Sequence, residues 1–116
     1  MEITRETQGA VCILRVESDR IDAAIAIQFK DMFRDVAASV SGPVVLDLGQ
    51  VTFLDSSGLG AVVAARKLLG ADRTLELAGL NPAVEKVMQL TRMNTVFPIH
   101  ATRDAALAAH GVAPAA

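Results

Sequence analysis

The first sixteen residues carry the hydrophobic pattern of two β-strands joined by a turn. Residues 3–7 and 10–16 are rich in β-branched side chains, and Gln8-Gly9 between them is a common turn dipeptide. In the second run, apolar side chains occupy both alternating sets of positions, so we expect neither face of this strand to meet solvent fully. The pattern predicts a hairpin whose second strand lies inside a sheet.

A helical period follows a short polar loop. Apolar residues recur every three or four positions from residue 25 to residue 40, which indicates one buried helix face. Asp22 stands just before this stretch, where its carboxylate can accept hydrogen bonds from the first free N–H groups. Ile27 falls nearly opposite the apolar stripe, so it is either a stray surface residue or part of a contact surface. The stripe consists of Ile25, Phe29, Met32, Phe33, Val36 and Val40.

The rest of the chain alternates short apolar runs with helical patterns. We expect a buried strand over residues 44–48, a helix from the serines to Leu69, a strand over 75–78, a helix capped by Asn81 and stopped at Asn94, an edge strand over 97–100, and a helix from Thr102 to Gly111. The residues expected to face inward are Ala61, Ala65, Leu68 and Leu69 in the second helix, and Val84, Val87, Met88 and Thr91 in the third.

Strands that alternate with helices require right-handed crossovers onto one sheet. The predicted fold class is therefore α/β, with a mostly parallel central sheet of about five strands and about four helices. At 116 residues, one domain is the natural count. We expect its core over residues 3–111 and a frayed tail over residues 112–116.

Composition and charge exclude several kinds of partner. The chain has 13 acidic and 11 basic residues, and its four aromatic residues are all Phe, so neither electrostatics nor base stacking favours nucleic acid. No apolar segment approaches the roughly 18 residues that a membrane span needs, and we expect no direct membrane insertion. With a single cysteine, Cys12, and no leader pattern, we expect a cytoplasmic protein.

Most catalytic arrangements do not fit the sequence. The histidines His100 and His110 and the lone cysteine lack the spacing of a metal site. The Gly58-Leu59-Gly60 segment lacks the third glycine of a dinucleotide fingerprint, and the serines lack the flanking glycines of a nucleophile elbow. We therefore expect no metal, no cofactor and no enzymatic activity.

The residues Asp55, Ser56 and Ser57 lie at a strand-to-helix corner. We expect Ser56 to cap the helix and Ser57, followed by Gly58, to present an open hydroxyl. A phosphate on Ser57 would add a charge of about −1.5 to −2 at the positive end of the helix, where the fold tolerates it. That charge would lie close to Asp55, and also to Asp22 and Asp47 if the strand ends converge. Because no Lys or Arg occurs between Arg34 and Arg66, it would weaken any interface over the corner.

The outer side of the second helix could extend this surface. If Ala61 and Ala65 face the sheet, Leu59, Val63 and Lys67 line the outer side and form a docking surface beside Ser57. The alternative is that this helix simply buries Leu59 and Val63.

The stretch VVLDLGQVTFLDSSGLG resembles the central motif of the STAS domains, specifically of the anti-sigma factor antagonists. The resemblance implies a protein that binds an anti-sigma factor serine kinase when unphosphorylated, which releases sigma factor. Phosphorylation of the second serine of the motif, here Ser57, would end binding, and a phosphatase would reverse it. ATP and magnesium would belong to the partner. The segment Arg20-Ile21-Asp22-Ala23-Ala24 is similar to the family's loop before the first helix, with Asp19 in place of a glycine.

On this basis the expected partner-binding residues are Asp22, Ile27, Asp55, Ser56, Gly58, Leu59, Val63 and Lys67. Other hypotheses remain open. The chain could be the STAS subunit of a lipid-transport ABC complex or of another signalling complex, whose motif is similar. A small hydrolase with Ser57 as nucleophile and His100 as base is a further alternative, as is nucleotide binding near Gly58 and Gly60.

Overall fold

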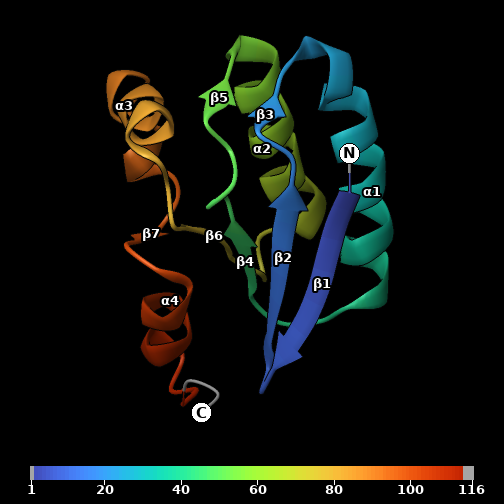
Figure 1. Cartoon of the computed structure of the whole chain (residues 1–116). Coiled ribbons are helices and arrows are strands. Elements are labelled where there is room, and N and C mark those ends of the chain that lie inside the picture. Colours follow the sequence, from blue (N-terminus) through green and yellow to red (C-terminus); the bar gives the residue numbers. More distant parts are fainter. Residues whose placement is uncertain (1, 114–116) are drawn as a thin grey trace.

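The computed structural model describes residues 2–113. Its central sheet has the strand order β1-β2-β4-β6-β7 (Figure 1). These strands are β1 (Glu2–Gln8), β2 (Val11–Glu17), β4 (Val44–Asp47), β6 (Leu75–Ala78) and β7 (Ile99–His100). β1 is antiparallel to β2, and every other pair in this sheet is parallel. The predicted five-stranded, mostly parallel sheet is confirmed, and the hairpin supplies its one antiparallel edge.

Two further strands form a small sheet that the sequence pattern did not predict. β3 (Arg20–Ile21) and β5 (Phe53–Leu54) pair in parallel, with Arg20 opposite Phe53 and Ile21 opposite Leu54. Two residues are too few to show a strand period, so local pattern could not indicate this pairing. It joins the loop before the first helix to the loop before the second.

The helices cover the two faces of the sheet unequally. α1 (Ala23–Ser39) and α2 (Ser56–Leu69) lie side by side over one face (Figure 1). The short α4 (Arg103–Ala109) packs against the other face, where Ala106 and Leu107 meet Ile13 and Val45. α3 (Pro82–Leu90) follows β6 and leads into a 3₁₀ turn, η1 (Met93–Thr95).

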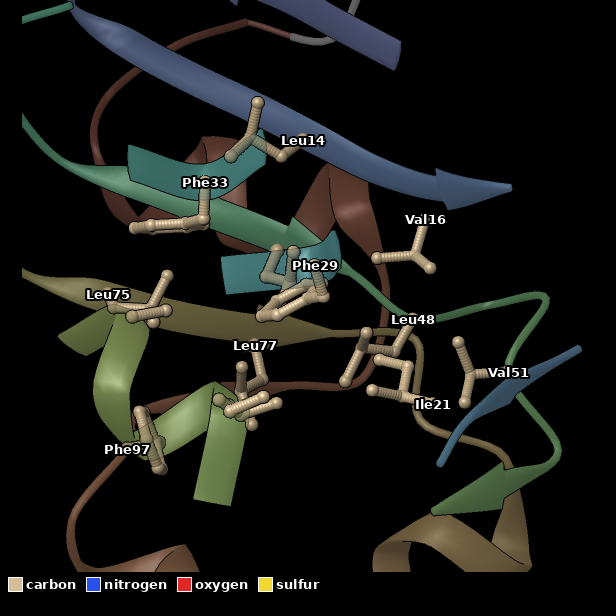
Figure 2. Close-up of a cluster of buried hydrophobic side chains, with 14 of the residues drawn as sticks. Leu14, Val16, Ile21, Phe29, Phe33, Leu48, Val51, Leu75, Leu77 and Phe97 are labelled. Atoms are coloured by element: carbon tan, nitrogen blue, oxygen red, sulfur yellow. The ribbon is translucent and has the colours of Figure 1, made fainter. Parts of the chain in front are cut away.

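The main core lies between the sheet and the helices α1 and α2. Phe29 and Phe33 of α1 are fully buried, with ring centroids 6.1 Å apart, and pack over Leu14 of β2 (Figure 2). The opposite face of β2 presents Val11 and Ile13 to the smaller cluster under α4. The expectation that this strand is covered on both faces is therefore confirmed. Each fully buried Val, Leu, Ile or Phe side chain contributes roughly 1.5–3 kcal/mol to the stability of the fold.

Several local predictions need correction. Leu68 is 36% exposed, and Val62 takes the inward position instead. α3 ends at Leu90 rather than at Asn94, because Arg92 adopts a left-handed backbone with a φ of 58° that a helix cannot continue. Thr91 is accordingly exposed, and its hydroxyl donates to the Val87 carbonyl.

Two other sites differ from expectation at the ends of elements. Asn81 does not cap α3 with its side chain; its amide instead donates to the carbonyls of Gly49 and Val51, at 3.0 and 2.7 Å. The edge strand expected over residues 97–100 shortens to Ile99–His100. Val112, placed by the sequence in a frayed tail, packs against the cluster under α4, whereas residues 114–116 lie outside the described part of the chain. Within residues 2–113, no helix has the length and apolar character of a membrane span.

Candidate functional site

The first helices begin at a shared corner, and Asp55 holds them together. One oxygen of its carboxylate accepts a hydrogen bond from the Gly58 N–H, at 2.8 Å, and so caps α2. The other oxygen accepts from the Ala23 N–H at the start of α1, at 3.2 Å. The expectation that Ser56 caps the helix is wrong. Asp55 occupies the cap position, and its carboxylate has two acceptor oxygens, so it can serve both helix starts.

Asp22 caps α1 as predicted, accepting from the Ala24 N–H at 3.1 Å. Its second oxygen pairs with the Arg20 guanidinium at 3.3 Å. Arg20 also lies over the Phe53 ring, 6.0 Å from its centroid, a distance at which a cation is attracted to the ring face. The corner thus contains a cation, Arg20, although the sequence has no Lys or Arg between Arg34 and Arg66. The position of Arg20 follows from the pairing of β3 with β5, which the sequence pattern does not predict.

Both serines lie on the surface in the first turn of α2. The side chains of Ser56 and Ser57 are exposed. The hydrogen bonds that hold this corner together are made by Asp55, and within residues 2–113 they do not involve either serine hydroxyl. Ser57 lies beside the free N–H groups at the start of α2, where the helix has a partial positive charge. The Ser57 hydroxyl is therefore open to another protein and lies where added negative charge is tolerated.

Gly58 has a different role from the one expected. It is buried, and a Cβ added to it would lie 2.7 Å from the Ile21 carbonyl carbon and closer still to the carbonyl oxygen. The Leu54 side chain would be 2.9 Å away. Glycine is needed here because α2 approaches the backbone of β3; Ile21 itself points into the core beside Leu48 and Val51 (Figure 2). The residue that leaves the helix surface open is Gly60, whose added Cβ would meet nothing within 4 Å.

The outer side of α2 also differs from the main expectation. Leu59 and Val63 are half-buried and pack against the core, so the alternative interpretation of this helix is the better one. Ser57, Gly60 and Lys67 are exposed instead, and their spacing places them on one side of the helix. The exposed apolar groups near the corner come from other elements. They are Ile27 of α1, which is 69% exposed, and Phe53 of β5, which is 50% exposed.

Two residues that the sequence associated with Ser57, Asp47 and His100, make hydrogen bonds to other residues. Asp47 accepts a hydrogen bond from the Gly49 N–H, at 2.9 Å, in the turn after β4. His100 Nε2 lies 2.7 Å from a carboxylate oxygen of Glu76. Because β6 alternates, with Leu75 and Leu77 in the main core, Glu76 points to the face that α4 covers. His100 is therefore on the opposite face of the sheet from α2, and the Ser57–His100 hydrolase hypothesis is contradicted.

Glu76 forms a buried polar cluster that sequence reasoning missed. It is 5% exposed, and its carboxylate also lies 2.6 Å from His110 Nε2 at the end of α4 and accepts from the Thr74 hydroxyl. Burial by itself would raise the pKa of Glu76, but the hydrogen bonds from His100, His110 and Thr74 outweigh it and hold that pKa below the ordinary value. Among residues 2–113, no three His, Cys, Asp or Glu side chains are arranged to hold a metal ion.

The sequence and the order of elements match a known family. The profile of the STAS domain matches residues 2–106. This chain belongs to the STAS domain family. The STAS domain is 37% identical over 67 residues to BtrV of Bordetella bronchiseptica, a protein named as a candidate anti-sigma factor antagonist. The match spans 57% of this chain and 58% of that protein.

Solved structures agree with this assignment. An anti-sigma factor antagonist from Mycobacterium paratuberculosis is 30% identical to this STAS domain, with a TM-score of 0.84 over 93% of this chain and 92% of the other. The anti-sigma factor antagonist SpoIIAA in its unphosphorylated form is 20% identical, with a TM-score of 0.75 over 97% of this chain and all of the other. At that identity SpoIIAA shows a shared fold. SpoIIAA of Bacillus has also been solved in a phosphorylated form.

The residues predicted to bind a partner fall into two groups in this STAS domain. Ile27, Ser56 and Lys67 are exposed, and Asp22 and Asp55 are half-buried because they hold the two helix starts. The remaining three contribute mainly to packing: Gly58 is buried, and Leu59 and Val63 pack on the core. The surface around Ser57 therefore consists of exposed residues from α1, β5 and α2.

Proposed function

We propose that this STAS domain is an anti-sigma factor antagonist regulated by phosphorylation of Ser57. Unphosphorylated, it binds an anti-sigma factor that is also a serine kinase, and sigma factor is released. Phosphorylated, it no longer binds, and a phosphatase restores the active form. The observation that carries the proposal is the exposed Ser57 hydroxyl in the first turn of α2, on a chain whose relatives include anti-sigma factor antagonists.

The position of Ser57 separates the effect of a phosphate on folding from its effect on binding. The phosphate would lie next to the free N–H groups and the positive end of α2, an arrangement that stabilises an anion by about 0.3–1 kcal/mol. The phosphate would point into solvent, because the Ser57 side chain is exposed. The folded state is therefore expected to persist after modification.

An interface over the corner would respond differently. The carboxylates of Asp22 and Asp55 already lie there, and Arg20 is paired with Asp22 rather than free to neutralise a phosphate. Each unit of like charge brought within about 6 Å of the phosphate costs about 1–3 kcal/mol at dielectric constants between those of water and a protein surface. In the free domain, water screens this repulsion. A partner that covers the corner would remove that water and would thus lose about tenfold to a hundredfold in affinity.

The surface beside Ser57 offers the apolar contacts that a partner needs. Ile27 lies one helical turn after Ala23, whose N–H is bound to Asp55, and Phe53 lies in β5, two residues before Asp55. Large apolar and aromatic side chains at the centre of an interface contribute most of the binding energy. We infer that Ile27 and Phe53 are contacts for the kinase, and that ATP and magnesium are bound by the kinase and not by this chain.

The proposal is tested first by phosphopeptide mapping of the protein from its native cells. Modification at Ser57, and not at Ser56 or Thr52, is the expected result. Binding of the co-purified kinase is then measured for Ser57→Asp and Ser57→Ala, with Ser56→Ala as the matched control one residue away. We expect Ser57→Asp to weaken binding at least tenfold with an unchanged melting temperature, and Ser57→Ala to bind and resist phosphorylation. Undiminished binding by Ser57→Asp, or a transport ATPase as the main co-purified partner, would contradict the proposal.

A further inference from the structure

A cavity with a positively charged wall lies at the other end of α2 from Ser57. Its volume is about 490 Å³, within the range of roughly 300–1,000 Å³ that is usual for small-molecule sites. It is formed by the last turn of α2, the loop that leads into β6, and the segment after η1. Ser57 and Lys67 are ten positions apart on the helix, which corresponds to about 15 Å. The cavity is thus separate from the corner.

Three cations line this cavity, and no carboxylate of the described residues does. They are Arg66 and Lys67 of α2 and Arg73 of the following loop. The end of α2 contributes about half a negative charge, which is much less than the three positive charges of the side chains. Asp72 lies next to Arg73 in the chain but is exposed and does not line the cavity. A protein with a net charge of −2 therefore has a local site suited to an anion.

Arg73 is held rigidly beside the cavity by two hydrogen bonds to backbone carbonyls. Its Nε donates to the Gly42 carbonyl at 3.1 Å, and its Nη1 donates to the Ala37 carbonyl at 3.0 Å. Its Nη2 is buried and has no acceptor in residues 2–113. Because Nη2 is buried, the cavity does not reach it, and Arg73 contributes a fixed positive charge to the cavity wall. The N–H groups that an anion can contact belong to the exposed side chains of Arg66 and Lys67.

The remaining wall of the cavity is apolar. Leu75 at the start of β6 and Val96 and Pro98 before β7 face it. Leu75 is largely buried in the main core, but a bare inorganic anion would leave Val96 and Pro98 without contact. The combination of cations on one side and apolar groups on the other fits a ligand that has an anionic group and a small apolar body.

We propose that this cavity binds a small phosphomonoester. Its phosphate interacts with Arg66, Lys67 and Arg73, and its apolar part packs against Leu75, Val96 and Pro98. Lys67 was also predicted to bind the partner, but it lies about 15 Å along α2 from Ser57. The proposal therefore does not depend on the phosphorylation of Ser57.

Phenyl phosphate is the probe that tests both parts of the site. It is titrated into the ¹⁵N-labelled full chain at constant ionic strength, and amide shifts are followed by NMR. We expect saturable shifts at Gly70, Ala71 and Thr74, and weaker binding of inorganic phosphate and of phenol, each of which lacks one half of the ligand. Shifts that do not saturate, or that spread evenly over exposed cations such as Lys86 of α3, would overturn the proposal.

Substitutions make the test specific. Arg66 and Lys67 are exposed, so the double variant Arg66→Gln/Lys67→Gln is expected to fold, and its melting curve checks this. Loss of two charge-assisted hydrogen bonds is expected to raise the Kd for phenyl phosphate at least tenfold. Lys86→Gln removes an exposed lysine that does not line the cavity and should leave the Kd unchanged. Equal affinity of the double variant and the wild type would refute the site.

Discussion

Gly58 is the point at which α2 touches β3, and replacing it with alanine tests how the corner is assembled. The added Cβ would lie 2.7 Å from the Ile21 carbonyl carbon and 2.9 Å from the Leu54 side chain. The nearest atoms belong to the Ile21 backbone, which cannot move aside as a flexible side chain can. α2 and the β3–β5 pair must therefore separate by several tenths of an ångström or more in the variant.

The magnitude follows from two opposing effects. Overpacking of this kind costs about 1–3 kcal/mol or more, and the clash with backbone places Gly58→Ala toward the upper end. Alanine in place of glycine inside a helix offsets this by up to about 1 kcal/mol. We expect a net loss of about 2 kcal/mol in the free energy of unfolding. For a chain of this length, that corresponds to a fall of about 6–10 °C in the melting temperature.

Gly60→Ala is the matched control, two residues along the same helix. Its added Cβ meets nothing within 4 Å, so only the helical preference acts, and stability should rise by up to about 1 kcal/mol. Because the chain has no Trp or Tyr, unfolding is best followed by far-ultraviolet circular dichroism, with heat and with urea. If Gly58→Ala were as stable as Gly60→Ala, the close contact between α2 and the backbone of β3 described above would be wrong.

Four variants test other parts of the molecule. Asp55→Ala removes an acceptor from two helix starts and should destabilise the fold by about 1–3 kcal/mol in urea titrations, whereas Ser56→Ala should change stability by less than about 0.5 kcal/mol. Ile27→Ala should weaken kinase binding about tenfold in a calorimetric titration with no loss of melting temperature. The pKa of Glu76 in the folded state lies below its ordinary value. The stability that ionised Glu76 contributes is therefore fully present at pH values above the ordinary glutamate pKa of about 4.3. This stability is lost as the pH falls through the folded-state pKa. A Glu76→Gln variant should therefore melt earlier than the wild type at neutral pH, and the gap should close in acid; a gap independent of pH would contradict this account.

Local pattern was enough to predict the order of the main elements. The hairpin, the buried strand β4, the strand β6 and the caps at Asp22 and Thr102 all appear as expected. Each depends on interactions within about four residues along the chain, or on a period that the residues themselves carry. The same reasoning located the strand-to-helix corner with Asp55 and the serines. It erred on which residue caps α2, because serine and aspartate are almost equally good caps and only the bound N–H groups distinguish them.

Features that depend on the meeting of distant segments required the tertiary structure. β3 and β5 are separated by the whole of α1 and β4, and their pairing places Arg20 over Phe53 and the Ile21 carbonyl against Gly58. Glu76 reads as a polar residue in a strand, yet the folding of β7 and α4 around it buries it between two histidines. Local sequence pattern was thus sufficient for the main helices and strands and for the position of Ser57 at the start of α2. The packing of those segments decided which side chains share a surface, since contacts between residues thirty positions apart leave no periodic signal in the chain.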